Sequence, residues 1–247
     1  MAQQAGSDEA YEALLEQGAG ISPGVRLGRP GRSKLYWLTI AIMRVLKVRL
    51  DVDLEGGQHL RRGTPAILVA NHVSAWDPVC VVMSGWWRVT AFAKAEYFGG
   101  RGAFFFRWMG QIPLRRGDAE STAWAMRMSQ EALAHGGMVG IYPEGTRSPD
   151  GRLHKLHKRI LIPLLQANPD VAVHAVTMAY DKRPGRRTRV TGRVSAPLTL
   201  DTRSATPDEI VRVIRDAMIE LGGQEYVDEY AQTVKRRRPL PAEPVQG

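Results

Sequence analysis

Short apolar runs bounded by turn-forming residues recur along this chain, and they predict buried β-strands. Residues 67–70 (Ile-Leu-Val-Ala) follow a Gly-Thr-Pro turn and end at His72, and residues 138–142 end at Pro143. A strand that stops at a polar residue in this way is typical of a strand that ends at a site. Further strands are predicted at residues 48–54, where apolar and polar positions alternate, and at residues 89–93 and 171–178.

Apolar residues at helical spacing predict the intervening helices. One of these helices begins at residues 206–209 (Thr-Pro-Asp-Glu), a capping box with proline at the first helical position, and apolar residues three and four apart follow from 210 to 221. Other helices are predicted at residues 79–83, 119–135 and 160–165. Because strands and helices alternate, the pattern indicates an α/β domain.

The two ends of the chain have a different character. The first residues contain a weak helix around Tyr11 to Leu15 and then a linker rich in Gly and Pro. Residues 33–49 are apolar, with two aromatics near the start and basic residues at both ends, which is typical of a helix in a bilayer interface; an ordinary core helix is the alternative. From Lys235 the chain is charged and Pro-rich, so we expect disorder. We therefore divide the chain into a flexible segment at 1–32, a domain with its interfacial helix at 33–222, and a C-terminal helix with a basic disordered tail at 223–247.

Composition narrows the class of protein. The 247 residues are 44% hydrophobic, which is enough for a full core, and the one cysteine, Cys80, excludes a disulfide framework and favours a reducing compartment. The net charge of +9 indicates an anionic partner: nucleic acid, a phosphorylated metabolite or an acidic membrane surface. The acidic first thirty residues predict no secretory signal, and the apolar stretch at 35–43 is too short to span a bilayer. We expect a cytoplasmic protein, peripherally associated with the inner face of the cell membrane.

Three polar clusters follow apolar, strand-like runs. The first is Asn71-His72 with Asp77, the second covers residues 110–117, and the third covers residues 144–147. The H-x4-D spacing allows the Asp77 carboxylate to hold one ring nitrogen of His72 while the other nitrogen acts as a base. The arginines of the other two clusters suit phosphate, because a planar guanidinium binds phosphate oxygens bidentately.

These clusters together resemble one family, the bacterial-type glycerol-phosphate and lysophosphatidic acid acyltransferases. That family carries N-H-x-S-x-x-D, an Ala-Lys-x-Glu segment, G-x-I-P-x-x-R and P-E-G-T-R, in this order. Here the four motifs lie at residues 71–77, 93–96, 110–116 and 143–147, and the resemblance covers roughly residues 33 to 200. It implies a single-domain, mixed β-sheet flanked by helices, with an N-terminal membrane-associating helix.

The resemblance also implies roles for individual residues. His72 would take the proton of an acceptor hydroxyl that attacks the thioester of acyl-CoA or acyl carrier protein, and Asp77 would orient the imidazole. The acceptor is expected to be lysophosphatidic acid, giving phosphatidic acid; another lyso-lipid, a glycolipid or a specialised acceptor would use the same base. No cofactor and no metal are implied. The residues expected to bind the substrate are Arg116, which is the motif arginine, Arg115, Glu144, Gly145, Thr146, Arg147, Lys94 and, mainly through the shape of the turn, Ser74.

Three other functions fit the sequence less well. A serine hydrolase built on Ser74 lacks a G-x-S-x-G elbow. A metal site at His154-x-x-His157 has ligand-like spacing but no supporting cysteine cluster or H-E-x-x-H motif. A nucleic-acid-binding protein would use the basic runs at 183–189 and 235–238, but aromatics are not interleaved with them, so we expect no nucleic acid partner.

Overall fold

Mixed sheet with helices on both faces

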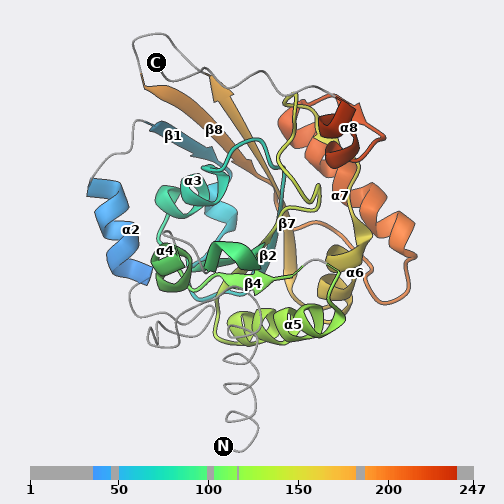
Figure 1. Ribbon diagram of the computed structural model, residues 1–247, viewed down its shortest axis with the longest axis horizontal. Coiled ribbons are helices and arrows are strands. Elements are labelled where there is room, and N and C mark those ends of the chain that lie inside the picture. The colour runs from blue at the N-terminus through green and yellow to red at the C-terminus, as the bar shows by residue number, and fades with distance from the viewer. Residues whose placement is uncertain (1–35, 46–49, 99–102, 116, 182–186, 238–247) are drawn as a thin grey trace, which may run out of the picture.

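The computed structural model describes residues 36–45, 50–98, 103–115, 117–181 and 187–237 (Figure 1). Within these residues, seven strands form one sheet in the order β1-β8-β7-β2-β5-β3-β4. The strands are β1 Leu50–Glu55, β2 Ala66–Ala70, β3 Val89–Lys94, β4 Ile112–Leu114, β5 Met138–Ile141, β7 Ala172–Asp181 and β8 Thr188–Val194. A separate parallel pair joins β6 Leu153–His154 to β9 Tyr226–Val227.

Strand directions decide where the carboxyl ends meet. The neighbours β7, β2, β5, β3 and β4 run parallel, β8 pairs antiparallel with β7, and β1 runs parallel to β8. The mixed sheet implied by the family resemblance is therefore confirmed. The five parallel strands deliver their following loops to one edge, which is where ligands bind in open α/β sheets.

Helices cover both faces of the sheet (Figure 1). They are α2 Tyr36–Val45, α3 Asp77–Ser84, α4 Ala103–Trp108, α5 Ala119–Ala134, α6 Lys158–Gln166, α7 Pro207–Gly222 and α8 Ala231–Arg237. Alternate residues of the fully buried strand β2 enter two cores, because side chains of a strand point to opposite faces. Leu68 packs in a core with Tyr36 and Cys80, whereas Ile67 packs in a core with Leu161 and Ile214.

Helix α2 is anchored to the sheet by its first residue. The buried Tyr36 hydroxyl donates to the carbonyl of Trp87 at 2.9 Å and accepts from the amide of Val89 at 2.8 Å. On the opposite side of α2, Leu38 and Ile42 are exposed. Among the described residues, no helix is long and apolar enough to cross a membrane.

Several predicted boundaries change. The helix predicted at residues 79–83 extends from Asp77 to Ser84, and the strand expected to end at Met178 continues to Asp181. The disorder predicted from Lys235 is wrong for residues 235–237, which complete helix α8. The predicted capping box of α7 is present, with Glu209 and Thr206 bonding reciprocally. The weak helix around residues 11–15, the remainder of the 33–49 segment and the tail from 238 lie outside the described residues.

Candidate active site

A buried carboxylate holds the histidine that follows strand β2

The centre of the site is the contact between His72 and Asp77. His72 Nδ1 lies 2.9 Å from Asp77 Oδ2. The same oxygen accepts the backbone amides of Val73 at 2.8 Å and Ser74 at 2.9 Å, and the Asp77 side chain is fully buried. Because backbone amides hold this carboxylate, its position is fixed by the turn between β2 and α3.

The histidine ring is oriented for proton transfer. Since Asp77 accepts at Nδ1, that nitrogen carries the proton and Nε2 is the basic nitrogen. The His72 side chain keeps 21% of its surface exposed, and its Nε2 has no hydrogen-bond partner among the residues described. One flank of the ring is fixed by Tyr142, whose ring centroid lies 4.5 Å away. The arrangement leaves Nε2 able to accept a proton.

Glu144 holds the loops around the base. Its Oε1 accepts the backbone amide of His72 at 2.8 Å, and its Oε2 accepts that of His154 at 3.0 Å. Burial raises the pKa of Glu144, and the two amide bonds offset this effect only in part. The side chain is fully buried. We therefore assign Glu144 to positioning, in place of the direct acceptor contact expected from the sequence, because both oxygens are already engaged.

The glycine that follows Glu144 lies close to the ring of His157. Gly145 has φ +72°, and a Cβ there would lie 2.9 Å from Cδ2 of His157. The next turn brings the amide of Ser148 to 2.6 Å from the carbonyl of His72, which places the loop carrying Thr146 and Arg147 beside the base. Arg147 is exposed and available to an anionic substrate.

The other predicted cations lie at the ends of the neighbouring strands. Lys94 ends β3 and pairs with Glu96 at 3.0 Å, and Arg115 follows β4 with a guanidinium nitrogen 3.6 Å from Asp118. Both reach the same edge of the sheet as His72, because β2, β5, β3 and β4 are parallel. Arg116 lies outside the described residues.

Ser74 shapes the turn, as the sequence suggested. Its amide bonds to Asp77, and its hydroxyl accepts the amide of Trp76 at 3.2 Å. The hydroxyl is thus part of a turn and not of a Ser-His pair, which removes the geometric basis for a serine hydrolase.

Relatives share the fold and the family

The sequence profile of the family described as "Acyltransferase" matches residues 51–181. The chain belongs to this acyltransferase family. The match covers more than half of the 247 residues and contains the whole His72–Asp77 site. The family implied by the four motifs is thereby confirmed.

Named relatives act on lysophosphatidic acid, according to their descriptions. The chain is 31% identical over 170 residues to a chloroplastic 1-acyl-sn-glycerol-3-phosphate acyltransferase of Arabidopsis thaliana, a match that covers 63% of this chain and 44% of the relative. It is 26% identical over 172 residues to the human 1-acyl-sn-glycerol-3-phosphate acyltransferase alpha, covering 65% of this chain and 59% of the relative. The chain thus matches less than two thirds of the length of either relative.

A solved structure has the same fold. The crystal structure of the 1-acyl-sn-glycerophosphate (LPA) acyltransferase PlsC from Thermotoga maritima superposes with a TM-score of 0.56 at 23% identity. The match covers 82% of this chain and 80% of that one. At this identity the likeness establishes the fold alone.

A C-terminal segment braces the acyltransferase site

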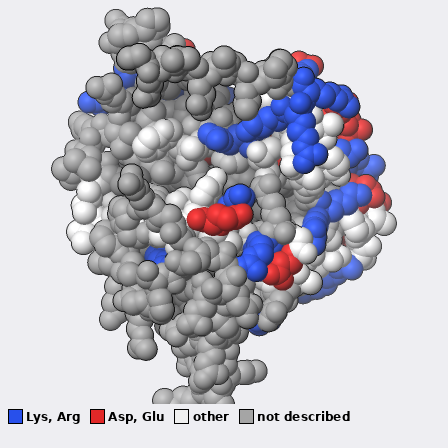
Figure 2. Space-filling model, in the orientation of Figure 1, with Lys and Arg blue, Asp and Glu red and all other residues white. Residues whose placement is uncertain are grey.

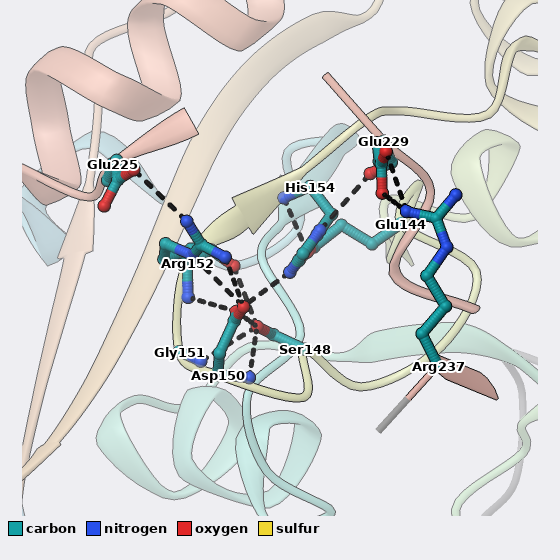
Figure 3. A network of polar contacts seen from close by, with 9 residues as sticks. All are labelled: Glu144, Ser148, Asp150, Gly151, Arg152, His154, Glu225, Glu229 and Arg237. Carbon is teal, nitrogen blue, oxygen red and sulfur yellow. Dashed lines mark hydrogen bonds and ion pairs between the residues drawn. The ribbon is translucent and has the colours of Figure 1, made fainter. Parts of the chain in front are cut away.

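Two residues that follow the family match at 51–181, Gln224 and Glu229, contact residues of the site. In Figure 3, His154 lies between Asp150 and Glu229: its Nε2 is 2.9 Å from Asp150 Oδ1, and its Nδ1 is 3.2 Å from the carbonyl oxygen of Glu229. Arg152 also holds Asp150, at 2.8 Å. Partial burial raises the pKa of Asp150, but hydrogen bonds from Arg152 and His154 outweigh it and hold that pKa well below its usual range.

Gln224 joins this segment directly to the catalytic turn. Its Oε1 accepts the side-chain amide of the buried Asn71 at 2.7 Å, and its Nε2 donates to the carbonyl of Gly151 at 2.6 Å. Asn71 in turn bridges to β7 through both the amide and the carbonyl of Met178. The residues flanking His72 are therefore held from β7, from the 148–154 loop and from the C-terminal segment.

Sequence reasoning did not find Tyr180, Gln224 or the role of His154. Tyr180 donates a hydrogen bond of 2.6 Å to Asp77 Oδ1, yet it lies in no motif. The two histidines with ligand-like spacing do not share a partner. His154 bonds to Asp150, and the ring of His157 stacks on that of Tyr230 at 4.1 Å between centroids. Across the described part of the chain, no group of three or more His, Cys, Asp or Glu is arranged to hold a metal ion.

Proposed function

We propose that this acyltransferase moves a fatty acyl group from acyl-CoA or acyl carrier protein to the free hydroxyl of lysophosphatidic acid, giving phosphatidic acid. The observation that carries the proposal is the His72–Asp77 contact of 2.9 Å at the carboxyl edge of the sheet, made by Nδ1 of a partly exposed ring. The descriptions of the two sequence relatives support lysophosphatidic acid as the acceptor.

The proposed reaction proceeds without a covalent acyl-enzyme. Nε2 of His72 takes the proton of the acceptor hydroxyl as its oxygen attacks the thioester carbonyl, so that the new C–O bond forms and the C–S bond breaks. Asp77 stabilises the imidazolium, which then returns the proton to the leaving thiolate. General-base help of this kind contributes on the order of 10² to 10⁴ in rate.

Cations around the base would bind the acceptor phosphate. Arg147 is exposed on the loop whose Ser148 amide bonds to His72, and Arg115 lies at the end of β4 on the same edge. Arg116 is assigned to the phosphate by the motif alone. Basic residues also gather on one side of the face shown in Figure 2, where Figure 1 places α8 with its exposed Lys235 and Arg236. This surface suits an anionic partner, whether the donor or the membrane.

We further propose that the protein associates peripherally with the inner face of the cell membrane. Leu38 and Ile42 on α2 are 56% and 47% exposed, and Trp86, which follows α3, is 48% exposed. Trp37 links the two elements, with its ring centroid 6.1 Å from that of Trp86 and the Arg62 guanidinium at 4.7 Å. Exposed apolar side chains, indole rings and cations are the composition of an interfacial surface.

The test is an acyl-transfer assay with palmitoyl-CoA and lysophosphatidic acid, following thiol release and the lipid product. Phosphatidic acid formed by the wild-type protein and lost in His72→Ala supports donor class, acceptor and base together. Thiol release that does not require an acceptor indicates a thioesterase instead. Turnover that is unchanged in His72→Ala contradicts the mechanism, and turnover only with another lyso-lipid or glycolipid changes the acceptor.

Arg147→Ala separates acceptor binding from chemistry. If Arg147 binds the phosphate, KM for lysophosphatidic acid rises about tenfold, in line with the loss of one charge-assisted hydrogen bond, while KM for palmitoyl-CoA changes little. Arg203→Ala is the matched control, because Arg203 pairs with the exposed Asp170 on the surface. A rise in the donor KM alone would assign Arg147 to the donor side.

A further inference from the structure

The two oxygens of Asp77 have different surroundings. Oδ2 receives His72 Nδ1 and the amides of Val73 and Ser74, whereas Oδ1 receives the hydroxyl of Tyr180 at 2.6 Å. Tyr180 lies near the end of β7, two residues beyond Met178, which Asn71 clamps through two hydrogen bonds. The hydroxyl is thus fixed by the sheet and reaches the carboxylate from the side away from the base.

The direction of the hydrogen bonds follows from counting protons. A tyrosine hydroxyl has one proton, and the Asp77 carboxylate can only accept, so Tyr180 donates to Asp77. Cys80 Sγ lies 3.7 Å from the Tyr180 oxygen, so its thiol donates to that oxygen. Burial raises the pKa of the Cys80 thiol to about 11 and raises the pKa of Tyr180 as well, so that both groups keep their protons at neutral pH.

We propose that Tyr180 is a positioning residue for the reaction, and that its hydroxyl limits the negative charge that Asp77 presents to His72. The inference rests on the proposed function of His72 as general base. A hydrogen bond to Oδ1 withdraws charge from the carboxylate, and this weakens the attraction of Oδ2 for an imidazolium. The Cys80 thiol polarises the Tyr180 hydroxyl and extends this series of hydrogen bonds into the core.

The consequence falls on the attraction between Asp77 and the protonated ring of His72. Without the hydroxyl, more charge lies on Oδ2, the protonated form of His72 persists to higher pH, and less of the reactive free base is present. The titratable groups that face Asp77 are His72, Tyr180, Cys80 and Tyr142, and Glu144 reaches the site through the amide of His72. Of these groups, Tyr180 donates a hydrogen bond from its hydroxyl to Oδ1.

The decisive variant is Tyr180→Phe, which keeps the ring and removes only the hydroxyl. We expect kcat near neutral pH to fall by up to about tenfold, the largest loss that a one-unit shift of the acid limb can produce. The acid limb of the kcat profile, measured from about pH 5 to about pH 9, should move up by about half to one pH unit, so that activity recovers at high pH. KM for the acceptor should stay within about twofold.

The matched control is Tyr226→Phe. Tyr226 also donates to an aspartate, Asp228 at 3.0 Å, but in strand β9 and at an exposed carboxylate. Its profile should overlay that of the wild-type protein. If Tyr180→Phe lowers kcat equally at every pH, or leaves the acid limb in place, Tyr180 has only a structural role and the inference is overturned.

An NMR titration of the His72 imidazole tests the inference without turnover, with the His72 signal assigned by its loss in His72→Ala. The midpoint should move to higher pH in Tyr180→Phe. A smaller shift of the same sign in Cys80→Ala supports the proposed series of hydrogen bonds from Cys80 through Tyr180 to Asp77, even if Tyr180→Phe fails to fold. No shift in either variant overturns the inference. If the wild-type protein shows no turnover that depends on His72, the proposed function is refuted. The NMR titration still tests the effect of Tyr180 on His72 in that case.

Discussion

Two histidines in this protein make the same contact and differ in everything around it. His72 lies 2.9 Å from Asp77, and His154 lies 2.9 Å from Asp150. The His72 side chain is 21% exposed, whereas the His154 side chain is fully buried. A carboxylate partner at hydrogen-bonding distance therefore does not by itself identify a catalytic base.

The difference lies in the second ring nitrogen. In His72 it has no hydrogen-bond partner among the described residues, so it is able to accept a proton. In His154 it faces the carbonyl oxygen of Glu229, so both nitrogens meet acceptors and both can donate only when the ring carries two protons. The first pair suits chemistry, and the second ties the 148–154 loop to the C-terminal segment.

The largest effect expected from this comparison is on catalysis. His72→Gln removes the base but keeps a polar side chain, so kcat should fall by a factor of about 10² to 10⁴. Thermal unfolding should change little, since the amides of Val73 and Ser74 still hold Asp77. Assay and melting curve are measured on the same preparation; a large loss of stability without loss of kcat would reverse the roles assigned to the two histidines.

The matched change at the second site should act on stability. His154→Ala leaves Asp150 without its buried partner and opens a cavity, and we expect the free energy of unfolding to drop by about 3 to 5 kcal/mol. Denaturant titration measures this loss. Residual kcat should exceed that of His72→Gln, because the base and its carboxylate are intact, and a variant with full stability and no activity would contradict the bracing role.

Lowering the pH should weaken the contact between His154 and Asp150. The folded pKa of Asp150 lies below the unfolded value, so its stabilisation is fully present above about pH 4 and is lost as pH falls through the folded pKa. The pair should therefore stabilise the folded protein at neutral pH. Denaturation of the wild-type protein between about pH 5 and about pH 2 should show this loss, and Asp150→Asn should flatten that part of the curve.

The smallest expected effect belongs to the residue that links the two sites. Ser148 donates its amide to the carbonyl of His72, and its hydroxyl lies 2.8 Å from the carbonyl oxygen of Arg152. Ser148→Ala keeps the first contact and removes the second, so we expect a loss of about 1 kcal/mol in stability and a change in kcat of less than about threefold. A larger loss of kcat than of stability would show that the two sites are coupled through this hydroxyl.

The elements that the sequence predicted well are those decided by local pattern. The apolar run at 67–70 became a fully buried central strand, and the residues of the capping box at 206–209 bond as expected. The site residues came from motifs whose order matched a family, and parallel strands then brought His72, Glu144 and Arg115 to one edge.

What the sequence did not reveal depends on contacts between distant segments. Tyr180 meets Asp77 across 103 positions, and Gln224 meets Asn71 across 153. Strands β6 and β9 have two residues each, too few for a periodic pattern. Glu144 was expected to face the acceptor because it lies in a motif; its burial between two backbone amides became visible only in three dimensions.

The contacts of Gln224 with Asn71 and of Glu229 with His154 also set a time of assembly. Chains fold from the amino end as the ribosome releases them, so the sheet and the His72–Asp77 pair can form before this segment has been made. Gln224 and Glu229 are made after both, and they add a further partner to Asn71 and to His154. A nascent chain would thus hold the His72–Asp77 pair before it gains the contacts that fix the surrounding loops from residues 224 and 229.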